Sequence, residues 1–349
     1  MKLSKALLKP VIVSVCLVCF IKAFSQTDTA ALSAKLTQNR EKLGKDVAFI
    51  LYRDGKMVYK KEMGKLNIKA PIPVGASSQW LTAALVMTFV QEGKLSLDDN
   101  VSTYLPIFSK YYKGFVTIRQ CLTNYTGIQS EQGIAKLLQK NKFKSLEDEV
   151  DELASKRDIV TNAGTEFRYS NVGFDIVGRV LEVITKRTFE RLIQERITRP
   201  LAMKNSTFTN EDYNAAVRPA MGARCSAADY INFLSMLLNK GSFNNKPVLT
   251  ESSVATLLTL TTEASQVKYA PKPAEGLNYA LGAWILETDA QGKASALAVP
   301  SLMGTWPIID LCRGYACVVF ARQIPGEQTR DLYMDIKATV DDMAGGNYQ

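Results

Sequence analysis

One stretch, Trp80 to Glu92, is apolar on most sides and constrains the fold of this chain more than any other. A helix that is apolar nearly all round has to be surrounded by protein rather than by water. Gly93 is suited to end such a helix, and Ser77 or Ser78 is suited to cap its start. The sequence therefore predicts a buried central helix with other layers packed around it.

Strand patterns gather near both ends of the chain, with helical patterns between them. Val47 to Tyr52 and Met57 to Tyr59 flank the tight turn Asp54-Gly55. The later strand patterns are Tyr279 to Leu286, Pro307 to Asp310 and Ala316 to Ala321. Asn171 to Lys186 repeats apolar residues at helical spacing, and we expect Asp331 to Met343 to form a final helix. This order predicts an α/β chain of the α+β type. We expect an antiparallel sheet from both chain ends flanked by helices, an all-helical middle lobe, and a ligand cleft between them.

The same pattern suggests how the chain is organised. We expect a lead-in over 26–46, one domain over 47–343 and a tail over 344–349. Within the domain, the sheet lobe would comprise 47–75 and 279–343, and the helical lobe about 76–278. There are no repeats or long linkers to indicate further domains.

The first 25 residues have the features of a bacterial secretory signal. Three lysines precede Val11 to Ile21, an apolar run too short to span a bilayer, and small residues at 23 and 25 favour a cut before Gln26. We expect a secreted or periplasmic protein. An uncleaved anchor is the alternative, because Lys22 interrupts the cleavage region. No later stretch is apolar enough to form a transmembrane segment.

Charge and cysteine content suggest few special partners. The formal net charge of +9 would fall to +5 with the signal, and the basic residues are interleaved with acids, which argues against a nucleic-acid groove. Cys312 and Cys317 could form a disulfide across a hairpin or remain free thiols. No cysteine pair has zinc spacing, and Asp98-Asp99 is typical of a turn, so we expect no metal and no cofactor. The oligomeric state is left open.

The chain contains no histidine. A Ser-His-Asp triad, a histidine base and every histidine metal site are therefore excluded. Any acid–base chemistry has to use Lys, Tyr, Asp, Glu or Cys.

Several segments, in their order and spacing, resemble the serine β-lactamases and the penicillin-recognising serine hydrolases. The segments are Gly93 to Asp99 with Tyr104-Leu105-Pro106, Ile118 to Ile128, Gly164 to Asn171, Pro200 to Met203, Asp229 to Gly241 and Gly304 to Asp310. The resemblance covers roughly Val47 to Met343 and implies that family's fold. In Ile118 to Ile128, Asn124 stands where the family usually has histidine.

The resemblance also implies which residues should form the site. In this family a serine at the start of the buried helix attacks a carbonyl group, and a lysine three residues later assists. Alignment on Thr82-Ala83-Ala84 puts Ala76 at the serine and Gln79 at the lysine. Ser301, in Val299-Pro300-Ser301, stands where the third motif has lysine or histidine. Tyr169 and Asn171 of the second motif are kept, either for the site or only for loop geometry and helix capping.

Two hypotheses follow. The first is a non-catalytic binding or regulatory protein whose cleft takes a small-molecule, peptide or cell-wall-like ligand, because a chain with alanine and glutamine at these positions lacks both nucleophile and base. The second is an active β-lactamase, DD-carboxypeptidase or esterase that uses Ser77 or Ser78 with Tyr169 as base. Capping is the simpler interpretation of the two serines. A purely structural envelope protein is a third interpretation.

Overall fold

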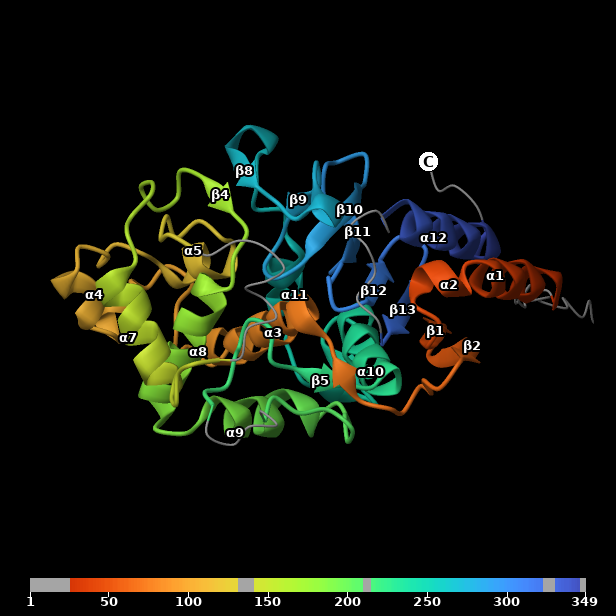
Figure 1. Ribbon diagram of the computed structural model, residues 1–349, viewed down its shortest axis with the longest axis horizontal. Helices are drawn as coiled ribbons and strands as arrows, with labels where there is room; N and C mark the ends of the chain where they lie inside the picture. The colour runs from red at the N-terminus through yellow and green to blue at the C-terminus, as the bar shows by residue number, and fades with distance from the viewer. Residues whose placement is uncertain (1–25, 131–140, 210–214, 323–329, 346–349) are drawn as a thin grey trace, which may run out of the picture.

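The computed structural model describes residues 26–130, 141–209, 215–322 and 330–345, so the predicted signal lies outside the described residues. Within those ranges, no helix combines the length and the apolar character that a membrane crossing requires. Figure 1 shows a sheet with helices on both sides and a lobe made mostly of helices next to it.

The centre of the fold is a seven-stranded sheet in the order β2-β1-β13-β12-β11-β10-β9. Its strands are β1 (Val47–Arg53), β2 (Lys56–Met63), β9 (Asn278–Tyr279), β10 (Trp284–Thr288), β11 (Ala294–Ala298), β12 (Thr305–Asp310) and β13 (Tyr315–Ala321). Every neighbouring pair is antiparallel, and β1 and β13 join the two ends of the chain. The predicted fold class is therefore confirmed.

The sheet also differs in detail from the sequence prediction. We expected one strand from Tyr279 to Leu286, but a turn in which the Ala280 N–H donates to the Ala283 carbonyl at 2.8 Å separates β9 from β10. Strand β11 was not predicted at all. Its sequence, Ala294–Ala298, is rich in alanine, which gives little strand signal.

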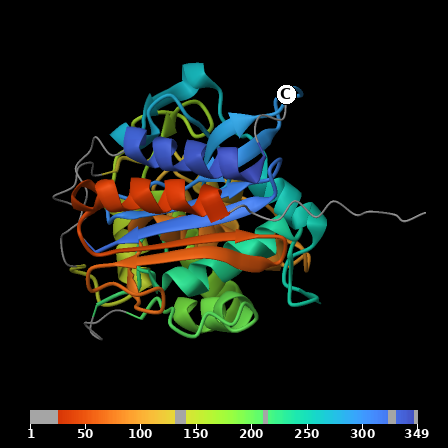
Figure 2. The ribbon, with the colours of Figure 1, turned by 90° about the vertical axis from the view of Figure 1, so that its right-hand side faces the viewer.

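Two helices, α1 (Gln26–Gln38) and α12 (Arg330–Ala344), lie side by side across one face of the sheet (Figure 2). Alternate residues of β1 serve the two faces. Phe49 packs in the core under α1 and α12, whereas Ile50 packs in the larger core on the opposite face. The expected lead-in thus forms part of the layer that covers the sheet, continued by the short α2 (Arg40–Leu43).

Helix α10 (Ala227–Leu238) covers the opposite face, and α3 (Ser78–Val90) lies between the sheet and the helical lobe. The side chains of α3 from residue 78 to residue 89 are buried, so the predicted buried central helix is confirmed. The predicted side-chain cap is wrong. A 3-10 turn, η1 (Gly75–Ser77), leads directly into α3, and Ser77 at the N-cap position has helical backbone angles and makes no side-chain cap bond.

The remaining elements form the helical lobe and its connections. The helices are α4 (Ile107–Lys110), α5 (Ile118–Leu122), α7 (Leu146–Lys156), α8 (Val172–Thr185), α9 (Phe189–Ile193) and α11 (Glu251–Leu258). The short strands are β3 (Ile72–Pro73), β4 (Phe167–Arg168), β5 (Arg224–Cys225), β6 (Ser242–Phe243), β7 (Lys246–Pro247) and β8 (Val267–Tyr269). Pairing of β4 with β8 brings residues 169–171 beside residues 267–270.

Candidate functional site

A cavity of about 690 Å³ lies where the start of α3, the start of α8 and the turn before β12 meet. Its volume is in the usual range for small-molecule sites. Ala76, Tyr169, Asn171 and Ser301 all line this cavity. Four positions chosen from widely separated motifs are therefore brought to one place.

The backbone beside Ala76 is held tightly against the turn that carries Ser301. Gly75 has a φ of +52°, and a Cβ atom built on it would lie 2.6 Å from both Ser301 Oγ and Met303 Cγ. Glycine is thus required at this position both by its backbone angle and by the close approach. The Ser301 hydroxyl accepts a hydrogen bond from the Met303 N–H at 3.1 Å, which stabilises its own turn.

Ser77 and Ser78 do not line the cavity and are fully buried on other sides of the helix start. The Ser77 hydroxyl lies 3.1 Å from Thr305 Oγ1 and donates to the Val299 carbonyl at 3.3 Å. The Ser78 hydroxyl accepts from the Ala223 N–H at 3.0 Å. Both serines therefore connect the helix start to neighbouring segments instead of presenting a hydroxyl to the cavity.

Gln79 is fully buried, and its carboxamide is hydrogen-bonded at both ends. Its oxygen accepts from the Tyr279 hydroxyl at 3.0 Å. Its nitrogen donates to Asn171 Oδ1 at 3.4 Å and to the Ser170 carbonyl at 3.3 Å. A carboxamide can donate and accept at once, which a lysine ammonium cannot. Gln79 therefore joins the sheet edge to the start of α8.

Tyr169 lies in the cavity wall among aromatic rings, 5.3 Å from Trp284 and 6.2 Å from Tyr279 between ring centroids. Burial raises the pKa of its phenol strongly, the neighbouring Tyr269 raises it further, and a hydrogen bond with Gln79 opposes the shift. Because none of the groups that act on this phenol is a cation that would stabilise the phenolate, Tyr169 stays protonated near pH 7 and is a poor general base.

Asn171 precedes α8 but does not cap it with its side chain, so the capping interpretation of this residue is wrong. Its amide nitrogen instead contacts Met221 Sδ at 3.1 Å, and its oxygen receives the bond from Gln79. The segment is positioned by Asn124, whose side-chain oxygen accepts from the Ser170 N–H at 2.9 Å and whose carbonyl accepts from the Arg168 N–H at 3.0 Å.

Sequence reasoning missed several residues of the site. Tyr279 was seen only as the start of a strand, although its hydroxyl holds Gln79. Asp175, Glu149 and Arg218 also line the cavity and were not singled out. One signal was available for Asp175, because an acidic residue falls within an otherwise apolar stretch of the amphipathic helix 171–186. Nothing local marks Glu149, which lies in a highly charged helix.

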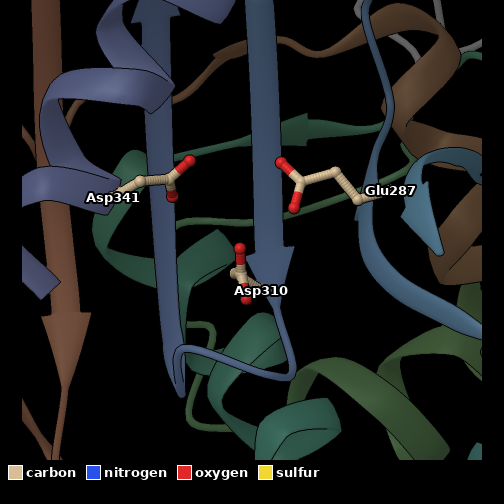
Figure 3. Close-up of side chains that lie close together, drawn as sticks. All are labelled: Glu287, Asp310 and Asp341. Carbon is tan, nitrogen blue, oxygen red and sulfur yellow. The ribbon is translucent and has the colours of Figure 1, made fainter. Parts of the chain in front are cut away.

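A cluster of acidic residues, which bears on the metal expectation, lies on the face of the sheet that α12 covers. Glu287 from β10, Asp310 from β12 and Asp341 from α12 point toward one another (Figure 3). Lys337 Nζ contacts all three carboxylates at 2.5, 3.2 and 2.8 Å respectively, and Arg313 pairs with the same three at 2.9, 2.7 and 3.7 Å. The charges of this ion-pair cluster are therefore met by cations of the chain itself.

Cys312 and Cys317 are both free, the first exposed and the second buried in β13, so the disulfide that the sequence left open is not formed. Trp284 and Trp306 are buried core residues. Asp98 and Asp99 serve the turn before α5, where Asp98 pairs with Arg119 at 2.8 Å and Asp99 accepts from the Ser96 N–H at 2.8 Å.

Comparison of the whole chain with known proteins shows which proteins it is similar to. Residues 36–339 match the family model described as Beta-lactamase. A solved structure from Bacteroides dorei DSM 17855, provisionally described as a beta-lactamase, has a TM-score of 0.80 and 26% sequence identity, covering 90% of this chain and 98% of that chain. The penicillin binding protein from Bacillus halodurans has a TM-score of 0.69 at 19% identity, covering 88% and 98% of the two chains, and shows similarity of fold alone.

Curated relatives match over part of their length. Protein flp of Staphylococcus aureus (strain MW2) is 26% identical over 179 residues, which is 48% of this chain and 36% of that protein. Beta-lactamase-like protein 4 of Dictyostelium discoideum is 28% identical over 193 residues, which is 48% of this chain and 33% of that protein. The match therefore spans about a third of the length of these curated relatives.

Proposed function

Since the chain belongs to the β-lactamase family, we propose that it is an exported, non-catalytic member that uses the family's cleft to bind a ligand. The ligand would be a small molecule, a peptide or a cell-wall-like glycan or ester, and the role would be binding or regulatory. Export rests on the signal-like first 25 residues alone.

One observation carries the proposal: the side chain at the attacking position of the cavity is the methyl group of Ala76, and the group expected to activate it is the carboxamide of Gln79. In a serine hydrolase such as subtilisin, loss of the catalytic nucleophile lowers turnover by about a millionfold. The cavity has a volume of about 690 Å³ and several polar side chains in its lining, which supports binding of a ligand.

The rival is an active hydrolase that uses Ser77 or Ser78. For this, a fully buried hydroxyl would have to leave its present hydrogen bonds, and each bond so broken leaves an unpaired polar group that costs about 1–3 kcal/mol. Tyr169 would also have to act as base although its pKa is raised by burial. The intact second motif is the feature that favours this rival.

Covalent labelling separates the two functions. The chain from residue 26 is incubated with a fluorescent penicillin and a fluorophosphonate, and intact-mass spectrometry with peptide mapping locates any adduct. We expect no adduct on the natural chain. An adduct on Ser77 or Ser78 would establish the rival and overturn the proposal.

A paired variant tests whether the cleft itself persists. Ala76→Ser together with Gln79→Lys restores a hydroxyl and an amine at the expected positions, and we expect an adduct on residue 76. Ala76→Ser alone is the matched control, since it has the hydroxyl without the amine and should be labelled far more slowly. A folded double variant that binds no probe, by labelling or by a change in its melting temperature, would contradict the idea of a retained cleft.

A further inference from the structure

The cavity has a second polar end, one helical turn along α8 from Asn171. Asp175 is four residues after Asn171, so the two side chains lie on one face of the helix about 5–6 Å apart. Glu149 on α7 and Arg218, from the loop before β5, line the cavity at the same end. Three ionisable side chains from three separate segments therefore converge beside the candidate site.

Of the two carboxylates at this polar end, Asp175 is buried and Glu149 is half-buried, and each is only partly satisfied by hydrogen bonds. Asp175 is 4% exposed, and its Oδ1 accepts from the Ala220 N–H at 3.0 Å. Among the described residues, no other hydrogen bond reaches this carboxylate. Glu149 Oε2 accepts from Asn141 Nδ2 at 3.0 Å. Charges at such depth interact far more strongly than charges in water.

The charge at this end is unbalanced. Two carboxyl groups face the single guanidinium of Arg218. Of the other charges near Glu149, that of Glu152 raises its pKa and that of Lys142 lowers it. Burial and the repulsion between the pair raise the pKa of Asp175, and burial raises the pKa of Glu149, which favours retention of a proton by the pair. A cation placed between the two carboxyls would remove the need for that proton.

The other cationic side chains of the cavity lie elsewhere. Lys268 and Lys272 are exposed at the mouth, where solvent and salt screen them. Arg157 follows the end of α7 in an extended conformation, and it is not among the groups whose charge shifts the pKa of Asp175 or Glu149. The deep end of the cavity is therefore its acidic end.

We propose that this acidic end receives an ammonium group, so that the ligand is an amide or ester carrying a protonated amine about one helical turn from its carbonyl group. The inference rests on the ligand-binding function proposed above and narrows the ligand class. On binding, the ammonium enters between Asp175 and Glu149, and the proton that the carboxyl pair held is released to solvent, so charge is conserved.

Three matched probes test the inference. They share a carboxamide and a four-methylene chain and differ in the end group: 5-aminopentanamide has an ammonium, hexanamide a methyl and adipamic acid a carboxylate. Their affinities are measured by isothermal titration calorimetry at pH 7 in two buffers of different ionisation enthalpy. We expect 5-aminopentanamide to bind at least tenfold more tightly than hexanamide, with release of up to one proton, and adipamic acid to bind most weakly.

Variants assign the effect to the residues. Asp175→Asn should reduce the preference for the amine to less than about twofold. Glu149→Gln should weaken it in the same direction, and it serves as the second variant if the first does not fold. Glu275→Gln is the matched control, because this side chain loses the same charge at the exposed mouth of the cavity and should leave the preference unchanged.

Equal binding of the amine and methyl probes would overturn the ammonium site while leaving the ligand-binding function in place. If Glu275→Gln lost as much of the preference for the amine as Asp175→Asn, the ammonium site would be overturned as well. The overall negative charge of the cavity, rather than this site, would then explain the preference. Absence of binding by all three probes would also reject the ammonium site. The labelling of the Ala76→Ser, Gln79→Lys variant would then decide the ligand-binding function separately.

Discussion

At the scale of single residues, the cavity wall is organised around a neutral group, the carboxamide of Gln79. Gln79 accepts from the Tyr279 hydroxyl with its oxygen and donates toward Asn171 with its nitrogen. A lysine at this position would bring a positive charge and three donors, but no acceptor for the Tyr279 hydroxyl. The proposed lack of catalysis and the stability of the cavity wall are thus linked through one side chain.

We expect Gln79→Lys to destabilise the protein by about 2–3 kcal/mol, because it buries an ammonium and leaves a buried tyrosine hydroxyl without its acceptor. Urea unfolding at pH 7 measures the change. Gln291→Lys, at an exposed turn, is the control and should change stability by less than about 0.5 kcal/mol. Equal stability of Gln79→Lys and the natural chain would show that the carboxamide network is not structural.

Asp175 gives a pH-dependent prediction. Burial raises the pKa of its carboxyl in the folded state, with the repulsion of Glu149 adding to the shift and the Ala220 N–H and Arg218 opposing it. The stability that this group contributes is therefore full below its unfolded pKa of about 4 and is lost as the pH rises through its folded pKa. Asp175→Asn stays neutral throughout.

The stability of Asp175→Asn relative to the natural chain should therefore rise between pH 4 and pH 8, as followed by urea unfolding at several pH values. Asp98→Asn is a control of opposite sign. The hydrogen bond from Arg119 lowers the pKa of Asp98, so this variant should lose relative stability as the pH rises to about 4 and show a constant difference above it. A stability difference for Asp175→Asn that does not vary with pH would contradict the prediction.

At the scale of elements, α12 is fixed to the sheet by both apolar and charged contacts. Tyr333 stacks on Trp306 of β12 with ring centroids 4.3 Å apart. Lys337, 1% exposed, holds the three carboxylates of the ion-pair cluster. Because desolvation offsets most of the attraction within a buried ion pair, we expect the cluster to add little net stability and mainly to fix where α12 lies.

Lys337→Met should destabilise the protein by about 3 kcal/mol, since three carboxylates would remain with Arg313 as their main cation. This loss lies at the lower end of the range for broken buried ion pairs because Glu287 is partly exposed. Thermal and urea unfolding measure it. Lys240→Met removes an exposed partner of Glu251 and should have little effect, so similar losses in both variants would argue against a special role for the cluster.

At the scale of the whole molecule, the sheet depends on both ends of the chain. Strand β1 pairs with β13, and α1 packs beside α12 over the same face. Leu32, Leu36 and Leu43 of the first two helices are fully buried. The described start of the chain is therefore part of the core and not a detachable lead.

A chain that starts at residue 46 instead of residue 26 should lose about 5 kcal/mol of stability, because three leucines leave the core and each contributes about 1.5–3 kcal/mol. Urea unfolding and binding of a hydrophobic dye report the loss and the uncovered face. Leu36→Ala alone should cost about 3 kcal/mol, whereas Gln38→Ala on the exposed side should cost little. Unchanged stability of the shortened chain would show that α1 is only a lead-in.

Much of this fold could be predicted from local patterns. The buried helix, the hairpin at Asp54-Gly55 and the final helix each have a strong signal, and their order indicates a sheet made from both chain ends. The elements that were missed have weak signals for physical reasons. Strand β11 consists mostly of alanine and serine, and the caps failed because η1 already continues the helix backward through Ser77.

Residue identities alone determined what chemistry the chain lacks: there is no histidine anywhere, and in the register of the family there is no hydroxyl at 76 and no amine at 79. Only the tertiary structure decided which polar groups meet in the cavity. Tyr279 lies 200 residues from Gln79, and Asp175, Glu149 and Arg218 come from separate segments. Contacts of that kind arise from the packing of whole elements, which no local pattern in the sequence encodes.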